Sequence, residues 1–280
     1  MTEIPFGARL RADAETLRAL HRPGDPLVLV NVWDAASARA VAAAPGCRAI
    51  ATASWSIAAA HGLPDGERIG REQMLAAVAR VAAAVELPVT ADLEAGYGAG
   101  PEEVAETAVG ALAAGAVGCN LEDGTRSGAE PLRPTAEHAA RVAAAVAAGE
   151  RSGVGLVVNA RTDVYLAEAG EPGGRLAAAL ERGRAYRDAG AACIFVPGVG
   201  DPREIGRLVE GMGAPVSVLA TAGGPSLPEL RDLGVARVSF GPGPLGVALA
   251  ALQRAAGALL AGEAFPEDLR FRLASPAPPA

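Results

Sequence analysis

The sequence predicts an α/β protein of the TIM (β/α)8 barrel class, and three observations lead to that class. The chain has 280 residues, half of them hydrophobic, which suits one large core and is a usual length for an α/β barrel. Short runs rich in Val and Ile recur along the chain, and each is followed by a longer segment with helical spacing. Eight such pairs are present, and eight βα units close into a barrel, with a doubly wound open sheet as the alternative.

The predicted elements alternate regularly from the first strand to the last helix. A leading helix is expected over residues 8–20. The strands are expected at residues 27–32, 48–53, 88–92, 117–122, 154–160, 192–196, 215–219 and 236–240. The helices that follow them are expected at residues 35–44, 71–85, 101–114, 134–148, 174–189, 202–211, 226–233 and 244–261. Residues 1–262 are therefore predicted to form a single barrel domain.

Start and stop signals in the sequence support these boundaries. Pro101 and Pro134 stand in the first turn of their helices, where a missing N–H costs nothing, and acidic residues follow them. Glycines end several helices just before the next strand, namely Gly115, Gly149, Gly190 and Gly234. Residues 263–280 end in Ser-Pro-Ala-Pro-Pro-Ala and are predicted to be a partly disordered tail.

The charge and the composition exclude several classes of function. A formal net charge of −7 and a pI near 5.1 argue against nucleic acid or a membrane surface as partner, so a small soluble partner is expected. The chain has no lysine, so all 25 basic residues are arginine. Schiff-base aldolase chemistry and pyridoxal phosphate attachment are excluded, because both need a lysine amine.

The cysteines and the hydrophobic runs indicate the expected compartment. Cys47, Cys119 and Cys193 are far apart in apolar surroundings, so each is predicted to be a small core residue and not a ligand or half of a disulfide. No signal-peptide core and no run that approaches a membrane span is expected. A reducing cytoplasm is therefore the expected location.

Carboxylates gather at the ends of two neighbouring predicted strands. Asp92 and Glu94 are two residues apart, so on a strand they point the same way, and Glu122 with Asp123 ends the next strand. The active sites of TIM barrels lie at these strand ends. Hard cations such as Mg²⁺ are held by one or two carboxylates together with water and substrate oxygens, so the pattern predicts a metal-assisted active site. The alternative is a cluster of acids satisfied by salt bridges.

Arg161 directly follows the fifth predicted strand. Its guanidinium is expected to project into the barrel mouth, where its planar fork suits a carboxylate or phosphonate. A structural ion pair with Asp163 or Glu122 is the alternative. The glycine-rich loops after the last three strands also have two interpretations, a phosphate cradle or turn geometry alone.

Four motifs follow one another in order along the predicted units. They are the Ser54…Gly62-x-x-Asp65 loop, Asp92-Leu93-Glu94-Ala95-Gly96-Tyr97-Gly98, Leu121-Glu122-Asp123 and Ala160-Arg161-Thr162-Asp163. Together they resemble the isocitrate lyase/phosphoenolpyruvate mutase superfamily, with a match over residues 30–252. The second motif is similar to the family's Asp-x-Asp-x-Gly-[Tyr/Phe]-Gly, with Glu94 in place of the second Asp.

The resemblance implies a Mg²⁺- or Mn²⁺-dependent enzyme of the lyase or phosphonomutase type. Such an enzyme acts on a small anionic 2-oxo or 2-hydroxy carboxylate and cleaves or rearranges a C–C or P–C bond through a pyruvate-type enolate. By position in the motifs, Asp92 is implied to be the direct metal ligand. Glu94 and Glu122 are implied to hold metal-bound waters.

The resemblance also implies the residues that hold the substrate. The backbone amides around Ala53, Ser54 and Trp55 and the side chain of Arg161 are implied to bind its anionic groups. Asp65 is implied to approach the reacting group, so Asp65 and Arg161 are the expected catalytic residues. A homotetramer is implied as well, in which neighbouring subunits exchange the C-terminal helix.

The loop after the fourth predicted strand departs from the family's lyases. The lyases have Lys-[Lys/Arg]-Cys-Gly-His there, whose cysteine is an acid/base, whereas residues 124–132 of this chain contain neither Cys nor His. Isocitrate and methylisocitrate lyase activities are therefore not expected, and the segment is too short for the mutase's gating loop. Three hypotheses stay open: an oxo-acid enzyme, a catalytically silent metal- and oxo-acid-binding barrel, and a different metal-dependent aldolase with His61 as its base.

Overall fold

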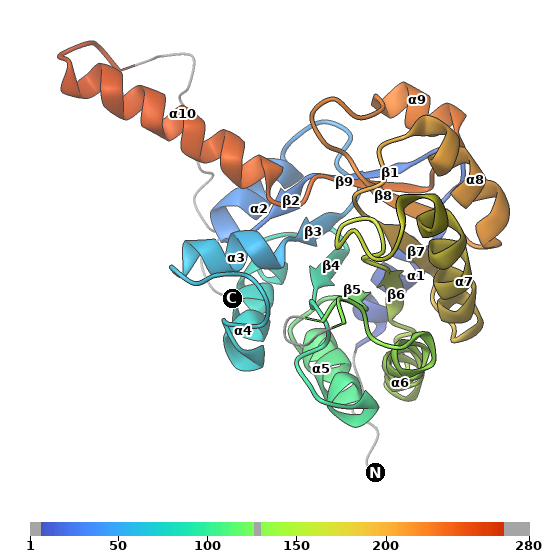
Figure 1. Ribbon diagram of the computed structural model, residues 1–280. Helices are drawn as coiled ribbons and strands as arrows, with labels where there is room; N and C mark the ends of the chain where they lie inside the picture. Colours follow the sequence, from blue (N-terminus) through green and yellow to red (C-terminus); the bar gives the residue numbers. More distant parts are fainter. Residues whose placement is uncertain (1–6, 126–129, 266–280) are drawn as a thin grey trace.

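The computed structural model describes residues 7–125 and 130–265, and one parallel sheet forms its centre (Figure 1). The strands of this sheet are β1 (Leu27–Leu29), β2 (Asn31–Val32), β3 (Ile50–Thr52), β4 (Val89–Asp92), β5 (Gly118–Glu122), β6 (Val157–Arg161), β7 (Cys193–Val196), β8 (Val216–Leu219) and β9 (Arg237–Ser239). Their order is β1-β9-β8-β7-β6-β5-β4-β3-β2, so neighbours in the sequence are neighbours in the sheet. The predicted TIM barrel is confirmed, and the doubly wound alternative is wrong.

The first predicted strand is divided at Val30 into β1 and β2, which corrects the single strand expected over residues 27–32. β1 pairs with β9, and β2 pairs with β3. The strands of a barrel are staggered, so a strand offers each neighbour only part of its length. Because the first and last strands of the order are consecutive pieces of chain, the sheet returns to its own start and the barrel is nearly closed.

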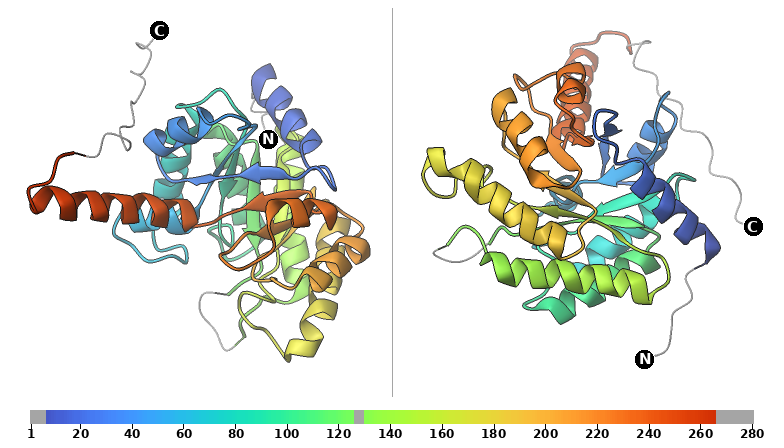
Figure 2. Two further views of the ribbon diagram at one scale, coloured as in Figure 1. Left: turned by 90° about the horizontal axis from the view of Figure 1, so that it is seen from above. Right: turned by 90° about the vertical axis from the view of Figure 1, so that its right-hand side faces the viewer.

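Helices surround this sheet on its outer side (Figure 2). They are α1 (Ala8–Ala19), α2 (Ala35–Ala42), α3 (Ser54–Ala60), α4 (Arg71–Ala82), α5 (Pro101–Ala113), α6 (Thr135–Arg151), the 3₁₀ turn η1 (Pro172–Gly174), α7 (Arg175–Asp188), α8 (Pro202–Met212), α9 (Leu227–Asp232) and α10 (Gly243–Leu260). All the predicted helices are present within a few residues of their expected bounds. The short elements α3 and η1 were not expected, because neither is long enough to show a helical period.

The N-terminal end of the barrel is closed by α1. Leu17 reaches the barrel interior there, since a Cβ added to Gly118 of β5 would lie 2.6 Å from Leu17 Cδ2. Arg18, on the exposed side of α1, donates a hydrogen bond to the carbonyl oxygen of Gly155 at 3.0 Å and so stabilises the position of the helix. The opposite end, where the strands finish in polar residues, is the mouth of the barrel.

The cysteines lie where the sequence analysis expected them. Cys119 and Cys193 are buried, Cys47 is partly buried, and all three are free thiols. Burial raises the pKa of Cys119 and of Cys193 to about 12. These thiols are therefore core groups that stay protonated at neutral pH.

The last helix, α10, leaves the barrel as a projecting arm (Figures 1 and 2). Of its 18 residues, Leu245 is the buried one. In length and composition α10 is apolar enough to cross a membrane, so the expectation that no run approaches a span is wrong by that test. A single helix of this kind is weak evidence for a membrane, because core helices and signal sequences pass the same test. The predicted disordered tail, residues 263–280, lies from residue 266 onward outside the described residues.

Candidate active site

A cavity of about 260 Å³ opens at the C-terminal ends of the strands. Its lining is Asn31, Ala53, Ser54, Trp55, Asp65, Asp92, Asn120, Arg161, Leu166, Phe195, Pro197, Leu219, Ser239, Gly241 and Pro242. Six of these are among the residues implied by the sequence motifs, namely Ala53, Ser54, Trp55, Asp65, Asp92 and Arg161. The structure therefore brings most of the expected site together at one mouth.

Asp92 ends β4, and two neighbouring segments fix its carboxylate. Its Oδ2 accepts hydrogen bonds from Ser54 N at 3.1 Å and from Ser54 Oγ at 2.9 Å. Its own backbone N–H donates to Thr52 Oγ1 at 2.9 Å. Asp65 Oδ1 lies 3.3 Å from the same Ser54 Oγ. Two carboxylates thus meet at one hydroxyl, which has a single proton to donate.

Asn120, on β5, has its amide orientation determined by two donors. Asn159 Nδ2 and Arg237 Nη2 both donate to Asn120 Oδ1, at 2.8 Å and 3.0 Å. The Asn120 Nδ2 group consequently faces Asp92 Oδ1, at 3.5 Å. Arg237 is fully buried inside the barrel and was missed by the sequence analysis, although a charged residue between Ala236 and Val238 was a signal that could have found it.

Arg161, at the end of β6, lies between two carboxylates. Its Nη1 is 2.7 Å from Glu122 Oε2, and its Nε is 2.5 Å from Asp163 Oδ1. Burial alone would lower the pKa of the guanidinium, but Glu122 and Asp163 raise it above its usual value, so Arg161 is a permanent cation. Its side chain lies over the Phe195 ring, 5.9 Å from the centroid, and lines the cavity. Arg161 thus forms ion pairs with both Glu122 and Asp163, and it also lines the cavity.

Glu94 lies two residues after Asp92, and its carboxylate contacts the loop that carries Asp65. Glu94 Oε2 accepts hydrogen bonds from Gly66 N at 2.9 Å and Glu67 N at 2.6 Å. Its Oε1 accepts one from Tyr97 Oη at 2.7 Å. Burial raises the pKa of Glu94, and the nearby Asp65 and Asp92 charges add to the rise. Glu94 is 1% exposed and is absent from the cavity lining.

Asp123, next to Glu122, points away from the mouth. Its Oδ1 accepts from Asp163 N at 2.8 Å, and its Oδ2 accepts from Arg182 Nη1 at 3.0 Å and from Tyr186 Oη at 2.7 Å. These partners lie on α7 and on the segment after β6. Asp123 therefore supports the strand ends that carry Glu122 and Arg161.

The loop that follows Asp92 is held from α6 by Arg141. Its Nη2 donates to the carbonyl oxygens of Ala95 and Gly98, both at 2.8 Å, and its Nη1 donates to that of Ala99 at 3.0 Å. Arg141 is fully buried. It was not singled out in the sequence, because a lone arginine on an alanine-rich helix resembles a surface residue.

Two of the main-chain amides expected to bind substrate, those of Ala53 and Ser54, donate hydrogen bonds within the protein. Ala53 N donates to Val32 O at 3.1 Å, and Ser54 N donates to Asp92 as described. Trp55, which is 46% exposed, lines the cavity with its side chain. His61 does not line the cavity, and its Nδ1 lies 2.9 Å from Ile57 O.

The glycine-rich loop after β9 also uses its amides internally. Phe240 N and Gly241 N each donate to Asn31 Oδ1 at 2.9 Å. Asn31 is buried at the mouth and donates in turn to Thr52 O at 2.9 Å. These two amides serve turn geometry, which was one of the two interpretations of this loop.

The donor set at the mouth fits a hard divalent cation. In residues 7–125 and 130–265 no three His, Cys, Asp or Glu side chains form a ready metal cage. Mg²⁺ does not need one, because one or two carboxylates suffice when water and substrate oxygens complete its shell. Asp65 and Asp92 approach the same Ser54 hydroxyl, so a cation held beside them would balance the negative charge of two neighbouring carboxylates.

Comparisons with known proteins agree with this geometry. The family model for phosphoenolpyruvate phosphomutase matches residues 17–260. An uncharacterized protein of Mycobacterium tuberculosis is 36% identical over 90% of this chain and 92% of its own. The 2-methylisocitrate lyase of Escherichia coli is 31% identical over 66% of this chain and 62% of its own.

Solved structures show the same barrel. A candidate phosphonomutase from Burkholderia cenocepacia is 46% identical, with a TM-score of 0.83, and the match covers 90% of this chain and 99% of that one. A phosphonopyruvate hydrolase in complex with oxalate and Mg²⁺ is 25% identical, with a TM-score of 0.79, covering 90% and 88%. The chain belongs to the phosphoenolpyruvate phosphomutase family, an enzyme family of lyases and phosphonomutases in the PEP mutase/isocitrate lyase superfamily.

Proposed function

We propose that the protein is a Mg²⁺-dependent enzyme that cleaves or rearranges a C–C or P–C bond of a small 2-oxo or 2-hydroxy carboxylate through a pyruvate-type enolate. One observation carries the proposal: Asp92, at the end of β4, and Asp65, in the loop after α3, meet at Ser54 Oγ on a cavity that Arg161 also lines. Anionic groups on one side and a permanent cation on the other suit a metal and a small acid.

Asp92 would hold the metal, and Asp65 and Asn120 line the cavity beside it. Glu94 and Glu122 would hold waters bound to the metal, as the sequence motifs predict. When bound, Mg²⁺ supplies positive charge that stabilises the negative charge developing on the substrate oxygens. Mn²⁺ has similar preferences for oxygen ligands and would substitute for it.

The chain's own residues would orient the substrate and exclude water. Arg161 lines the cavity while its guanidinium nitrogens contact Glu122 and Asp163, and its remaining N–H groups would donate to a substrate carboxylate. Leu166, Phe195 and Leu219 supply apolar walls. The cavity volume of about 260 Å³ lies below the usual range for sites that hold larger ligands, and therefore favours a substrate of a few carbon atoms.

Among the described residues that line the cavity there is no cysteine to supply the acid/base chemistry of the family's lyases. Cys119 is the second residue of β5 and Cys193 the first of β7, so both lie away from the C-terminal strand ends; both are buried, and neither lines the cavity. Their pKa values of about 12 keep them protonated. The proposed reaction is accordingly one in which Asp65 approaches the reacting group, and methylisocitrate cleavage is disfavoured.

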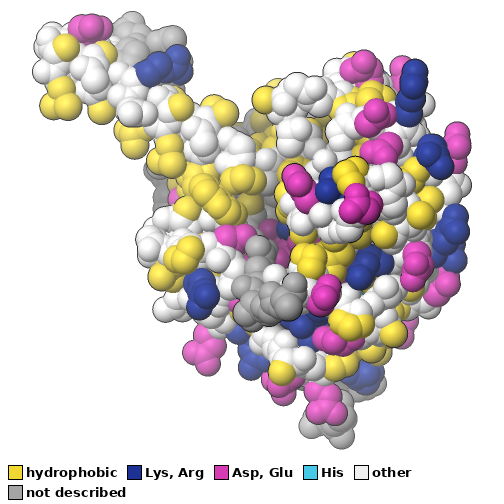
Figure 3. All heavy atoms as spheres, in the orientation of Figure 1, with side chains coloured by type: hydrophobic (Ala, Val, Ile, Leu, Met, Phe, Trp, Pro, Cys, Tyr) yellow, Lys and Arg dark blue, Asp and Glu magenta, His cyan; other side chains and the backbone are white. Residues whose placement is uncertain are grey.

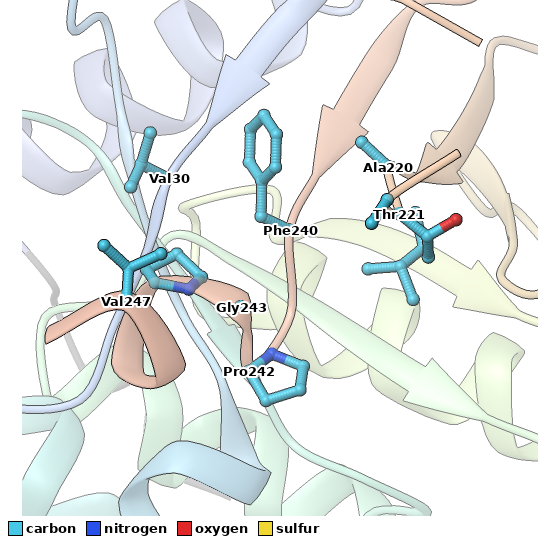
Figure 4. Close-up of a pocket in the computed structure, with 10 residues that line it drawn as sticks. Val30, Ala220, Thr221, Phe240, Pro242, Gly243 and Val247 are labelled. Carbon is cyan, nitrogen blue, oxygen red and sulfur yellow. The ribbon is translucent and has the colours of Figure 1, made fainter. Parts of the chain in front are cut away.

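We also propose that a second copy of the chain covers the base of α10, as expected of a homotetramer that exchanges this helix. An apolar pocket of about 780 Å³ lies there, lined among others by Val30, Phe240 and Val247 (Figure 4). Hydrophobic side chains continue along the projecting arm (Figure 3). Exposed apolar surface of this extent is typical of a protein interface. We propose a cytoplasmic location for the protein as well.

The test is a turnover assay by ³¹P and ¹H NMR with oxaloacetate, alkylated malates, phosphonopyruvate and phosphoenolpyruvate, with Mg²⁺ or with EDTA. We expect one of these compounds to be consumed in the presence of Mg²⁺ only. Ligand-induced thermal stabilisation without any product would instead favour the catalytically silent barrel. Loss of turnover in His61→Ala would favour the aldolase hypothesis.

A further inference from the structure

Two loops flank Asp92 and are tied to each other by reciprocal hydrogen bonds. The first covers residues 61–70 and carries Asp65, and the second covers residues 93–100. The carboxylate of Glu94, in the second loop, accepts from the backbone N–H groups of Gly66 and Glu67. The carboxylate of Glu67, in the first loop, accepts from Tyr97 N at 2.6 Å. Each loop therefore supplies both a carboxylate and a main-chain donor to the other.

The backbone at these residues is unusual. In the described part of the chain, four residues other than glycine have φ between +20° and +160°, and three of them are Glu67, Glu94 and Tyr97. Their φ values are 61°, 50° and 55°. Residues other than glycine rarely adopt these φ values, and such a backbone conformation persists only where surrounding contacts stabilise it. The contacts that hold it are the hydrogen bonds between the two loops.

The length of Glu94 matters for these contacts. The family pattern has aspartate at this position, and the longer glutamate places its carboxylate on the 66–67 amides. Both of its oxygens already accept hydrogen bonds, Oε2 from the two amides and Oε1 from Tyr97 Oη. The side chain is also absent from the cavity lining. Its contacts thus lie with the neighbouring loop.

We propose that Glu94, Glu67 and Tyr97 form a latch that holds the 61–70 loop closed, so that Asp65 stays beside Ser54 and Asp92. Glu94 is then a positioning residue for Asp65. The catalytic consequence rests on the proposed function, since it assumes that Asp65 acts on the reacting group. The latch itself rests only on the contacts between the loops.

Two substitutions at Glu94 separate this role from metal binding. Glu94→Gln keeps the length and an acceptor oxygen for the two amides, and its NH₂ group can donate to Tyr97 Oη. Glu94→Asp keeps the charge but is one methylene too short to reach the amides. A latch needs the length, whereas a group that holds a metal-bound water needs the charge.

The measurement is amide hydrogen exchange of residues 61–70 in the free protein, with Glu106→Asp as the matched control. Glu106 pairs with the exposed Arg71 nearby and takes no part in the latch. We expect Glu94→Asp to speed exchange at Gly66 and Glu67 at least about 10-fold and Glu94→Gln less than about 3-fold, since local opening controls exchange. Equal exchange in both variants, or faster exchange in Glu94→Gln, would overturn the latch.

Kinetics and metal titration provide the second readout. We expect Glu94→Asp to raise KM or lower kcat by about 10-fold through misplaced Asp65, with partial rescue in Glu94→Gln. A loss of Mg²⁺ affinity confined to Glu94→Gln would assign Glu94 to the metal instead. If Glu94→Asp does not fold, Tyr97→Phe removes one donor to Glu94, and unchanged exchange in that variant would also overturn the proposal. Absence of turnover in every variant would count against the proposed function, while the exchange data would still decide on the latch.

Discussion

At the scale of single residues, the position of Asp92 depends on neighbours from two strands, β3 and β5, and one helix, α3. Ser54 donates two hydrogen bonds to its carboxylate, Thr52 accepts from its backbone, and Asn120 faces its second oxygen. Groups that orient a metal ligand are worth a large part of its affinity. The residue identity of Asp92 therefore explains only part of the site.

Ser54→Ala tests this dependence. We expect it to weaken Mg²⁺ affinity or turnover by about 10- to 100-fold, because Asp92 and Asp65 lose the hydroxyl that lies between them. Ser56→Ala is the matched control on the same helix, since the buried Ser56 Oγ has no hydrogen-bond partner. Calorimetric titration with MgCl₂ checks the affinity. Similar losses in both variants would mean that α3 is merely perturbed.

Arg161 contributes to folding as well as to the site. Arg161→Met should lower the free energy of unfolding by roughly 3 kcal/mol, because Glu122 and Asp163 lose their buried cation. Urea denaturation measures the change. A loss below about 1 kcal/mol would show that these acids behave like exposed pairs, for which such small values are usual.

His138 predicts a dependence of stability on pH. Burial lowers its pKa from 6.5 to about 3, so the folded protein keeps it neutral while the unfolded chain protonates it below pH 6.5. The unfolded state then binds more protons, and stability falls as the pH drops from 6.5 towards 3. The slope attributable to His138 is up to about 1.4 kcal/mol per pH unit.

His138→Leu should flatten this dependence, while the similarly buried His21, with a pKa lowered to about 4, continues to contribute. Urea unfolding of both proteins at several pH values between 4 and 7.5 gives the two slopes. Parallel curves would show that His138 does not remain neutral in the fold.

At the scale of elements, α6 fixes the loop that follows Asp92. Arg141 crosses from this helix to three carbonyl oxygens of the loop. The alternation of strands and helices could be predicted from the sequence, because buried strands and amphipathic helices have different apolar periods. The seven-residue α3 could not, although it presents Ser54 and Trp55 to the cavity.

Arg141→Met should release the loop. We expect the free energy of unfolding to fall by about 2–3 kcal/mol, since hydrogen bonds from a charged donor are lost and three carbonyls are left unsatisfied. Mg²⁺ affinity should also fall, by about 10-fold, through displacement of Asp92. Urea denaturation and MgCl₂ titration measure the two effects. Unchanged affinity together with lowered stability would separate the loop from the metal site.

The candidate site shows where sequence reasoning succeeds and where it stops. Strand ends share one rim in a barrel, so the convergence of Asp92, Arg161 and Ser54 followed from position alone. The partners of each side chain did not, because they depend on rotamers and loop paths. Glu94 is the clearest case, since its contact with Gly66 crosses from one loop to another.

At the scale of the whole molecule, the projecting α10 leaves a large apolar surface in a single chain. Val247 is 73% exposed and Leu252 is 65% exposed, and both lie on this arm. Burial of such side chains releases roughly 1.5–3 kcal/mol each. The exposed side chains of α10 are therefore the surface on which the proposed assembly depends.

If the proposed oligomer forms through α10, a double variant, Val247→Glu with Leu252→Glu, should dissociate it into smaller species. The loss should reach several kcal/mol of association free energy, hence a rise in dissociation constant of at least about 100-fold. Sedimentation velocity over a concentration series measures it. Gln253→Glu, also exposed on α10, is the control for added charge, and equal dissociation in that variant would point to charge alone.

The proposed function requires Asp92 to hold a divalent cation that completes a site for a small enolate-like acid. Titration calorimetry with oxalate, a planar dianion resembling the enolate of pyruvate, tests it directly in wild-type protein and in Asp92→Asn, with and without Mg²⁺. We expect oxalate to bind the wild-type protein only when Mg²⁺ is present, and not to bind Asp92→Asn. Oxalate binding that persists without Mg²⁺, or that is unchanged in Asp92→Asn, would contradict it.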